Sequence, residues 1–319
     1  MKEKKQEITV VLNNINGFSS KERSLVNIIN AKRPNIVCLV ETKVTRQKTY
    51  NMKGYKDVIN KNVKQGKGGM LVAVRSNTVS SVKEVTTGSN QNILTVEVEY
   101  GTLVFRLILC YGPQEEDNVE DRKEFYEDLA IEMENCVLNN ITPVVLGDLN
   151  AKLEQSANGL VATSSNGLLL KSFIEKYDLQ VANFHSEAEG HFTRIRKKKG
   201  KLEKSLLDYI LTTQTFFDSI SNFTSDEEKL ETPFRLIKRG KAVSTIYSDH
   251  CLISASFNLP HKLKKEIPGK RWIITQEGLQ KFSELTTPPF FTIDETVGID
   301  VNYNKCTNKL QQTMGKCFR

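Results

Sequence analysis

Several features that would place this chain in a specialised class of protein are missing from its sequence. The longest apolar stretches, such as residues 102–112, contain a charge and fall well short of the roughly 20 apolar residues of a membrane-spanning helix. The N-terminal stretch "MKEKKQEITVVLNN" lacks the apolar run and small-residue cleavage site of a secretory signal. We therefore expect no membrane partner and an intracellular protein.

Cysteine pairs with metal-ligand or redox spacing are also missing. The six cysteines show no C-x-x-C spacing, and they are scattered over the chain at Cys38, Cys110, Cys136, Cys251, Cys306 and Cys317. Cys38 and Cys110 lie in apolar runs, where a thiol is typically a small core side chain. These observations predict reduced thiols rather than a disulfide framework or a zinc site.

The sequence does contain a repeated alternation of strand and helix patterns. A chain of 319 residues, 39% of them hydrophobic, can bury one large core or two ordinary ones. Apolar periodicity predicts helices at about 19–33, 117–137 and 166–178, with Ser19 and Glu22 at capping-box spacing in the first. Strands are predicted near 7–14, 35–41, 68–74, 93–101, 102–112, 143–148, 190–195, 205–212 and 250–257, with hairpin pairing between neighbours in the 68–112 region. This order favours β-sheets covered by helices, with polar turns at a common sheet edge.

The pattern changes after about Pro260. The segment "PHKLKKEIPGKRW" is basic and contains proline, and the residues beyond it lack strand patterning. We predict a core domain over residues 1–259 and, over residues 260–319, a basic linker with a helical C-terminal extension of one or two helices, near residues 275–285 and 303–314.

Positive charge is concentrated in one segment. The net charge is +7, and residues 194–204 hold seven Lys or Arg against one Glu, a local charge of +6. A solvated flexible loop would explain this segment. Phosphate contact is the alternative we favour, because concentrated positive charge displaces counterions from a polyanion.

Polar residues follow or begin several predicted strands. They occur in "NING", "VET", "YGPQ", "GDLN", "FT", "LLDYI" and "SDH", and comprise Asn14, Asn16, Glu41, Tyr111, Gln114, Asp148, Asn150, Thr193, Asp208, Ser248, Asp249 and His250. Each motif alone is also typical of a simple turn. Their convergence from separate strand ends, without a serine or cysteine nucleophile motif, favours a catalytic site.

The ordered set of motifs resembles the endonuclease/exonuclease/phosphatase superfamily over residues 7–259. Within it, "NING" and the short spacing from "FTR" to "LDYIL" are most similar to the endonuclease domain of non-LTR (LINE-type) retrotransposons. The resemblance implies a four-layered α/β sandwich of two packed mixed β-sheets flanked by helices, as in deoxyribonuclease I. It also implies a site at one rim of the sandwich.

The resemblance assigns roles in a metal-dependent phosphodiester hydrolysis. Such a reaction needs a hard cation, a base for water and donors for the phosphate oxygens. Carboxylates and amides suit Mg²⁺, with Mn²⁺ as a substitute. The implied metal ligands are Glu41, Asn16 and Asp249, and the implied catalytic residues are Asn14, Tyr111, Asp148, Asn150, Asp208, Asp249 and His250. Adjacent strand residues face opposite ways, so we expect Asp208 rather than Asp249 to orient His250.

The resemblance also implies double-stranded DNA as partner. The predicted DNA-contacting residues are Gln114, Thr193, Arg194, Arg196, Lys197, Lys198, Lys199, Lys201 and Ser248, with Thr193 positioning either a neighbour or the DNA backbone. Gln114 departs from the asparagine usual in the family's Y-x-P-N turn. A nick that primes retrotransposition would leave a 3′-hydroxyl for a reverse transcriptase domain or element RNA outside this chain, with action in the nucleus.

Three other functions fit parts of this sequence. An apurinic/apyrimidinic repair endonuclease shares the whole set of motifs. A phosphatase or sphingomyelinase fits less well, because "LLDYI" replaces the P-x-W-C-D-R segment of inositol phosphatases. A non-catalytic nucleic-acid-binding module would not need a competent side chain at every catalytic position.

Overall fold

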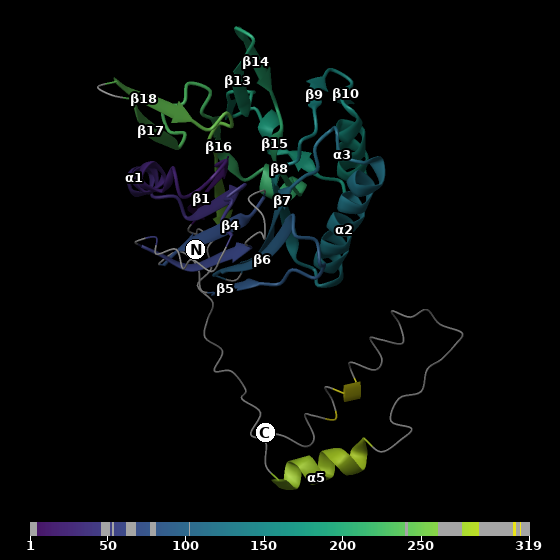
Figure 1. Cartoon of the computed structure of the whole chain (residues 1–319). Coiled ribbons are helices and arrows are strands. Elements are labelled where there is room, and N and C mark those ends of the chain that lie inside the picture. The colour runs from purple at the N-terminus through teal and green to yellow at the C-terminus, as the bar shows by residue number, and fades with distance from the viewer. Residues whose placement is uncertain are drawn as a thin grey trace. The chain divides into compact units, whose positions relative to one another are not determined.

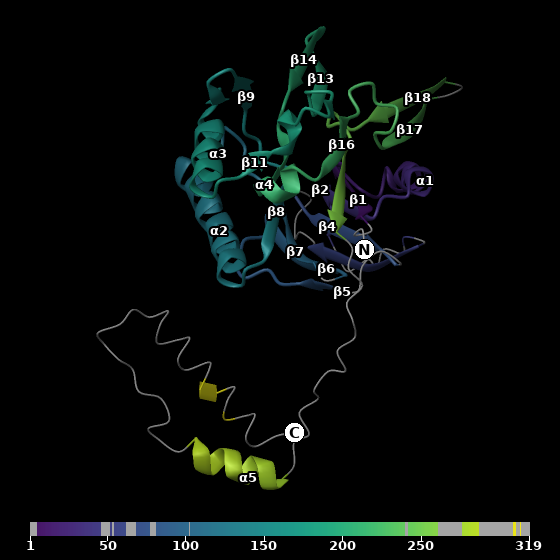
Figure 2. The same cartoon turned by 180° about the vertical axis from the view of Figure 1, so that it is seen from behind.

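The computed structural model describes residues 5–45, 52, 54–61, 68–76, 81–101, 103–239, 242–260, 276–286, 309, 310 and 313. The chain divides into two units, Met1–Leu263 and Lys264–Arg319 (Figures 1 and 2). The second contains α5 (Gln276–Leu285), and the helix predicted near residues 303–314 lies almost wholly outside the described residues. In the described part of the chain, no helix is long and apolar enough to cross a membrane.

Two mixed β-sheets form the centre of the first unit. One has the order β12 (Ala188–Glu189), β16 (Ile220–Ser225), β19 (Ile253–Pro260), β1 (Lys5–Asn14), β2 (Ile36–Val40), β4 (Met70–Arg75), β3 (Tyr55–Lys61). The other has the order β11 (Gln180–Val181), β15 (Asp208–Thr212), β8 (Thr142–Asp148), β7 (Leu103–Tyr111), β6 (Ile93–Tyr100), β5 (Ser81–Glu84). The β1–β2 and β7–β8 pairs are parallel, and their neighbours are antiparallel.

The apolar side chains of these strands explain the layering. Alternate residues of β1, such as Val10 and Leu12, share a buried cluster with Leu107 of β7 and Leu146 of β8, so the two sheets pack face to face. Helix α1 (Glu22–Lys32) covers the outer face of the first sheet. Helices α2 (Val119–Leu138) and α3 (Ser165–Lys176) cover the second (Figure 1). The predicted four-layered sandwich is confirmed.

The start of α1 differs from the capping-box prediction. The helix begins at Glu22 with Lys21 as its N-cap residue, and no side chain caps it. The Lys21 ammonium instead donates to the carbonyl oxygens of Ile15 and Asn16, at 2.7 and 2.8 Å. These two hydrogen bonds from Lys21 hold the loop between β1 and α1 in place of a side-chain cap.

Three hairpins and two short helices lie outside the two large sheets. The hairpins are β9–β10 (Leu153–Ser156, Gly159–Ala162), β13–β14 (Arg194–Lys198, Lys201–Ser205) and β17–β18 (Phe234–Arg239, Ala242–Tyr247). The short helices are α4 (Gln214–Phe217) and the 3-10 turn η1 (Ala182–Phe184). The strand predicted at 190–195 overlaps β13 only at its last two residues, Arg194 and Ile195; among the described residues, β13 pairs with β14 and, through a single bridge at Arg194, with His250.

The described cysteines match the thiol prediction. Cys38, Cys110, Cys136 and Cys251 are buried free thiols, and burial raises the pKa of each. Cys306 and Cys317 lie outside the described residues.

Candidate active site

The strand directions bring distant polar residues to one edge of the sandwich. Because β1 and β2 are parallel, as are β7 and β8, their carboxyl ends meet there. Tyr111 at the end of β7 pairs in register with Asp148 at the end of β8, and Asp148 pairs with Asp208 at the start of β15. A cleft of about 360 Å³ opens at this edge, and eleven of the eighteen predicted site residues line it: Asn14, Asn16, Glu41, Tyr111, Gln114, Asp148, Asn150, Arg194, Arg196, Asp249 and His250. Asp208 lies behind this lining and bonds to His250.

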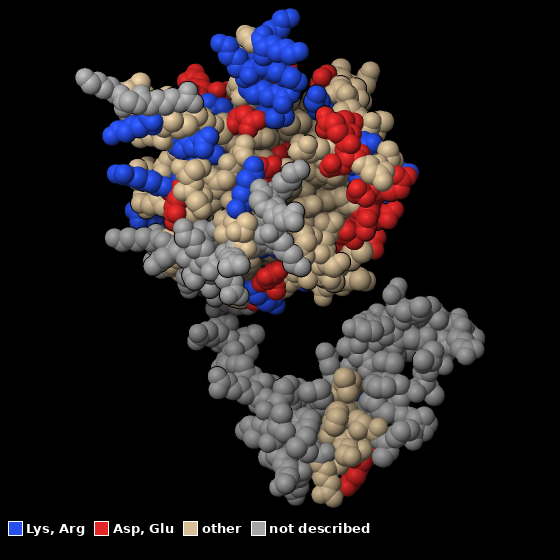
Figure 3. Space-filling model, viewed as in Figure 1, with Lys and Arg blue, Asp and Glu red and all other residues tan. Residues whose placement is uncertain are grey.

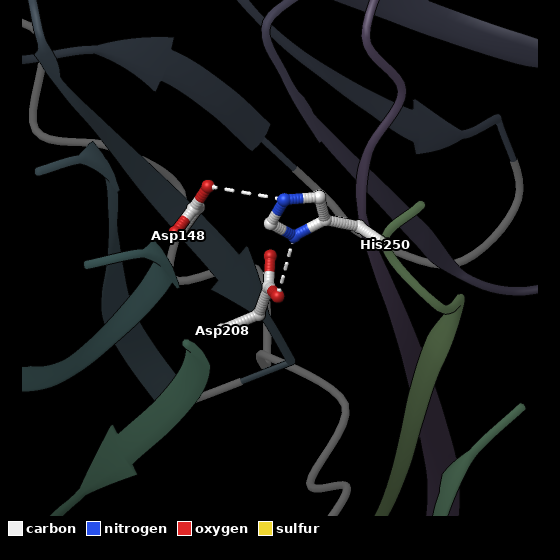
Figure 4. A group of neighbouring side chains, drawn as sticks. All are labelled: Asp148, Asp208 and His250. Carbon is white, nitrogen blue, oxygen red and sulfur yellow. Dashed lines mark hydrogen bonds and ion pairs between the residues drawn. The ribbon is translucent and has the colours of Figure 1, made fainter. Parts of the chain in front are cut away.

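Asp148, Asp208 and His250 form a buried cluster (Figure 4). His250 Nδ1 lies 2.8 Å from Asp208 Oδ2, and His250 Nε2 lies 3.7 Å from Asp148 Oδ2. The three residues are 5% exposed or less, while the Asp208 Oδ1 atom has no hydrogen-bond partner among the described residues. The ligand atoms lie within 4.8 Å of one another, so this set could itself hold a metal ion.

Burial and charge shift the proton affinities of this cluster. Burial, followed by the negative charge of Asp208, raises the pKa of Asp148 to about 7, against the opposing influence of His250 and the Asn14 amide. Burial alone would lower the pKa of His250, but the charges of Asp208 and Asp148 outweigh it and raise this pKa to about 9. At neutral pH the site therefore holds a protonated imidazole beside a carboxylate poised to exchange a proton.

A second group of polar residues lies across the cleft. Glu41 Oε1 accepts a short hydrogen bond from the Tyr111 hydroxyl, and Glu41 Oε2 lies 3.1 Å from Lys43 Nζ. The same ammonium donates to Asn16 Oδ1 at 2.6 Å. Oxygens from Glu41 and Asn16 thus lie around one positive charge, the Lys43 ammonium. Oxygen atoms are the ligands that a hard divalent cation takes. These residues fit the metal that the sequence predicts.

The loops that present this group have an uncommon backbone conformation. Asn16, Glu41, Lys43 and Asn150 all have positive φ angles, between 45° and 55°. A left-handed conformation is unfavourable for such residues, above all for Glu and Lys, and is typical of functional sites held by the surrounding structure. Asparagine is better tolerated there than most side chains, which accounts for two of the four positions.

Asn14 and Asn150 hold the Asp148 carboxylate from two sides. Asn14 Nδ2 donates to Asp148 Oδ2 at 2.8 Å, and the Asn150 backbone amide donates to Asp148 Oδ1 at 3.1 Å. The Asn150 side chain donates to the Gly112 carbonyl oxygen at 2.9 Å, so its own amide nitrogen is engaged. Gln114 is exposed at the cleft wall.

Asp249 and His250 do not bond to each other. Asp249 Oδ2 accepts from Arg194 Nε at 2.8 Å, while His250 bonds to Asp208. Burial would raise the pKa of Asp249, but the charges of His250 and Arg194 lower it below its usual value. The expected pairing of His250 with Asp208, rather than with its sequence neighbour, is what the structure shows.

Two residues predicted to contact DNA are buried instead. Thr193 is fully buried, and its hydroxyl oxygen accepts from the backbone amides of Leu207 and Asp208 at 3.0 and 2.9 Å. Ser248 is 2% exposed and donates to the Asn14 carbonyl oxygen at 2.7 Å. DNA contact is therefore wrong for both, because neither hydroxyl reaches the surface. Of the two roles considered for Thr193, positioning a neighbour is the one that its contacts fit.

The remaining predicted DNA-contacting residues lie on β13–β14. Arg194 and Arg196 are half-buried and line the cleft, where Arg196 Nε bonds to Glu203 Oε2 at 2.7 Å. The other four predicted residues are exposed along the hairpin: Lys197, Lys198, Lys199 and Lys201. Figure 3 shows the basic side chains of this hairpin projecting from the surface.

The sequence reasoning missed three residues that position the site. Lys43 bridges Glu41 and Asn16, as described above. Asn166 is fully buried and donates to the carbonyl oxygens of Pro113 and Asn150, at 2.8 and 3.1 Å. Asn183 donates to the Asp208 carbonyl oxygen at 3.0 Å. The lysine directly after "VET" was a usable signal for the first, whereas nothing local distinguishes the two asparagines.

The raised pKa values predict a pH-dependent stability in metal-free solution. The stabilisation from His250 is complete below its ordinary pKa of 6.5 and is lost as the pH rises through about 9. Asp148 acts in the same direction, since its raised pKa makes its ionisation in the folded state unfavourable up to about pH 7. Urea unfolding in EDTA should show the free energy of unfolding falling by about 2 kcal/mol from pH 6.5 to 8.

Two histidine variants distinguish the pH dependence that arises from His250 from the pH dependence of the other titratable groups. His250→Gln should lose most of the pH dependence, whereas His185→Gln should keep it, because the His185 ring packs on Phe217 away from the cluster. A wild-type free energy of unfolding that stays constant over this pH range contradicts the assignment.

Comparisons with known proteins identify the family and the fold of this chain. Residues 14–250 match the model of the Endonuclease/Exonuclease/phosphatase family. The structure is similar to the endonuclease domain of TRAS1, a telomere-specific non-LTR retrotransposon, with a TM-score of 0.58 and 17% identity over 79% of this chain and 99% of that one. It is also similar to the AP endonuclease LMAP from Leishmania major (TM-score 0.63, 12% identity, 80% of this chain and 89% of that one). The Xenopus laevis APE2 catalytic domain gives a TM-score of 0.60 and 18% identity over 81% and 94% of the two chains.

The family match covers well over half of the chain, from Asn14 to His250. The protein therefore belongs to the Endonuclease/Exonuclease/phosphatase family, as the strand-end motifs predicted. The solved structures share its fold at low sequence identity. A search of curated protein sequences finds no match.

Proposed function

We propose that this protein is a divalent-metal-dependent endonuclease that hydrolyses phosphodiester bonds of duplex DNA. The observation that supports this most directly is the convergence of Asp148, Asp208 and His250 beside Glu41 and Asn16 in one cleft. Such a set offers a base, a cationic donor and oxygen ligands in the lining of one cleft. The basic hairpin at the cleft favours a nucleic acid over a small phosphate ester.

Asp148 is the base in this proposal. Its carboxylate is fixed by Asn14 and the Asn150 amide, and its pKa of about 7 suits proton transfer near neutral pH. It orients a water for attack on phosphorus and takes its proton as the new P–O bond forms. The bond between phosphorus and the 3′ oxygen breaks, the leaving oxygen takes a proton from solvent water, and Asp148 returns its proton to solvent, leaving a 5′-phosphate and a 3′-hydroxyl.

His250 and Tyr111 act on the phosphate oxygens. The protonated imidazole, held by Asp208, donates to a nonbridging oxygen as negative charge builds up. Burial and the nearby Glu41 carboxylate raise the pKa of Tyr111, so its hydroxyl stays protonated and remains a donor. Glu41 and Asn16, with Asp249 nearby, would hold Mg²⁺ or Mn²⁺, which supplies charge neutralisation at the phosphate.

The wider role we propose is nicking of a target in retrotransposition. The supporting observations are the sequence motifs and the fold shared with a retrotransposon endonuclease domain. The 3′-hydroxyl left by the reaction would prime a reverse transcriptase carried by another chain or domain, acting on chromosomal DNA in the nucleus. An apurinic/apyrimidinic repair endonuclease is the second candidate, because its chemistry would use the same residues.

Cleavage of supercoiled plasmid tests the proposal. We expect nicked circles with Mg²⁺ or Mn²⁺ and none with EDTA, and termini that a DNA polymerase extends without prior treatment.

A parallel assay compares an intact duplex with one carrying a single abasic site. Preference for the abasic site by more than about a hundredfold would favour the repair function, a discrimination of about 3 kcal/mol. Intact plasmid under every metal condition would refute the endonuclease assignment.

A further inference from the structure

The hairpin β17–β18 has an exposed surface that the proposed chemistry does not use. Among the residues that the structure describes, its strands pair only with each other, and all six residues of β18 are exposed. Large apolar side chains lie open to solvent, with Leu236 63% exposed and Val243 56% exposed. An isolated hairpin gains little stability of its own, so an exposed apolar face on one points to a binding surface.

The base of this hairpin is fixed to the catalytic edge. The Phe234 backbone amide donates to Ser24 Oγ of α1 at 3.2 Å, and the Ser248 amide donates to the Pro233 carbonyl oxygen at 3.2 Å. The chain leaves β18 at Tyr247 and passes directly into Ser248, Asp249 and His250. Figures 1 and 2 both show β17–β18 and β13–β14 projecting from the same side of the sheets.

The charge of this hairpin has the same sign as that of β13–β14. Residues 234–247 include four basic residues and no acidic residue: Arg235, Lys238, Arg239 and Lys241. Arg235 and Lys238 are exposed. The positive charge of Arg235 also reaches the catalytic edge, where it contributes, after burial, to lowering the pKa of Lys21 to about 8.

The opposite side of the cleft is acidic. Residues 115–128 comprise the turn before α2 and the first half of that helix. They contain eight acidic and two basic residues, a net charge of −6. Glu115 and Glu116 of this segment line the cleft itself. In Figure 3 the Asp and Glu side chains gather over α2, and Lys and Arg lie over β13–β14 and toward β17–β18. A polyanion crossing the site is therefore attracted on one side and repelled on the other.

We propose that β17–β18 is a second DNA-binding arm, which together with β13–β14 holds the duplex on one side of the scissile phosphate. This inference rests on the proposed nuclease function and specifies the path of its substrate. Arg235 and Lys238 contact backbone phosphates, while the exposed apolar side chains pack against the sugars and the groove wall. The duplex turns away from the acidic face of α2. The stretch of DNA that the protein protects therefore extends further from the scissile phosphate on the β17–β18 side than on the α2 side.

Matched charge variants test the arm. Arg235→Gln/Lys238→Gln removes two positive charges from β17–β18, and Lys123→Gln/Lys176→Gln removes two from the exposed faces of α2 and α3. Affinity for a 30-base-pair duplex is measured by fluorescence anisotropy in EDTA at several salt concentrations. We expect the arm variant to bind about tenfold or more weakly at 100 mM salt, with the salt slope reduced by about 2. The control should bind within about twofold of wild type.

Further readouts separate the possible causes. Arg235→Lys/Lys238→Arg keeps the charge and should keep the affinity, and equal melting temperatures show that the variants fold alike. Hydroxyl-radical footprinting should show wild-type protection extending to one side of the site and shortened in the arm variant. If the arm variant binds DNA with wild-type affinity and salt slope, the proposal is overturned. The exposed apolar surface of β17–β18 would then be assigned to binding a protein. If wild-type protein binds duplex DNA but cleaves no plasmid in Mg²⁺, the nuclease function is refuted. The proposal that β17–β18 binds DNA is not contradicted by that result.

Discussion

Asp148→Asn should slow DNA nicking by about a thousandfold or more under single-turnover conditions with Mg²⁺. The amide has nearly the shape of the carboxylate but cannot take a proton from water. The Asn14 amide can still donate to the carbonyl oxygen at position 148, but the hydrogen bond from the Asn150 backbone amide is lost because an NH₂ group cannot accept it. Burial and the repulsion from Asp208 both raise the pKa of Asp148, and removing this buried charge offsets the lost bond, so the free energy of unfolding should stay within about 1 kcal/mol of wild type.

The appropriate control replaces an exposed acid outside the cluster. Asp121 is exposed on α2, and Asp121→Asn should nick at the wild-type rate. DNA affinity in EDTA should be unchanged or higher for Asp148→Asn, because a negative charge is removed near the phosphate. More than about a tenth of the wild-type rate in Asp148→Asn would show that another group is the base.

Gly147→Ala should lower the free energy of unfolding by more than about 4 kcal/mol. Gly147 has a φ of 149°, and a Cβ atom there would lie 1.9 Å from the carbonyl oxygen of Cys110 and 2.7 Å from its carbonyl carbon. Both atoms belong to the backbone of β7, which pairs with β8 and β6 in the middle of its sheet. Relief of the overlap would separate β7 from β8, and with them Tyr111 from Asp148.

Gly159→Ala isolates the contribution of backbone conformation. Gly159 also has a positive φ, 105°, but nothing lies within 4 Å of a Cβ atom built there. Its replacement should cost only about 1–2 kcal/mol, from the strained dihedral angle alone. Urea unfolding of both variants measures the difference, and equal losses for the two glycines would show that the close approach at Gly147 is not the cause.

The strand-end motifs predicted the main site residues because parallel strands bring their ends to one edge. "GDLN" begins with the last two residues of β8 and "YGP" with the last residue of β7, and these two strands are parallel neighbours. Local sequence was enough here, since each polar residue directly follows a continuous apolar run. Asp208 and His250 reach the same edge from antiparallel strands, β15 and β19, which start there.

Local patterns did not predict what lies beside these strands. The hairpin β13–β14 has strand-like residues at "FTRI", but its polar alternation gives it no buried face to pair with a core sheet. Thr193 and Ser248 are hydrophilic and adjacent to site residues, so exposure was a reasonable inference from sequence. Their hydroxyls instead satisfy buried backbone groups of residues that are distant in sequence.

The sequence alone predicted the central strands of both sheets, the three covering helices and the inventory of acids, amides and histidine, because apolar periodicity and strand-end chemistry are local properties of the chain. It did not predict sheet strands such as β3, β5 and β16, nor the hairpin β17–β18. Only the tertiary structure decided which carboxylate holds His250, that Lys43 lies between Glu41 and Asn16, and which hydroxyls are buried. These pairings join residues up to 234 positions apart, as between Ser248 and Asn14. They depend on sheet register and loop conformation, which are fixed by packing between the layers rather than by any short stretch of sequence.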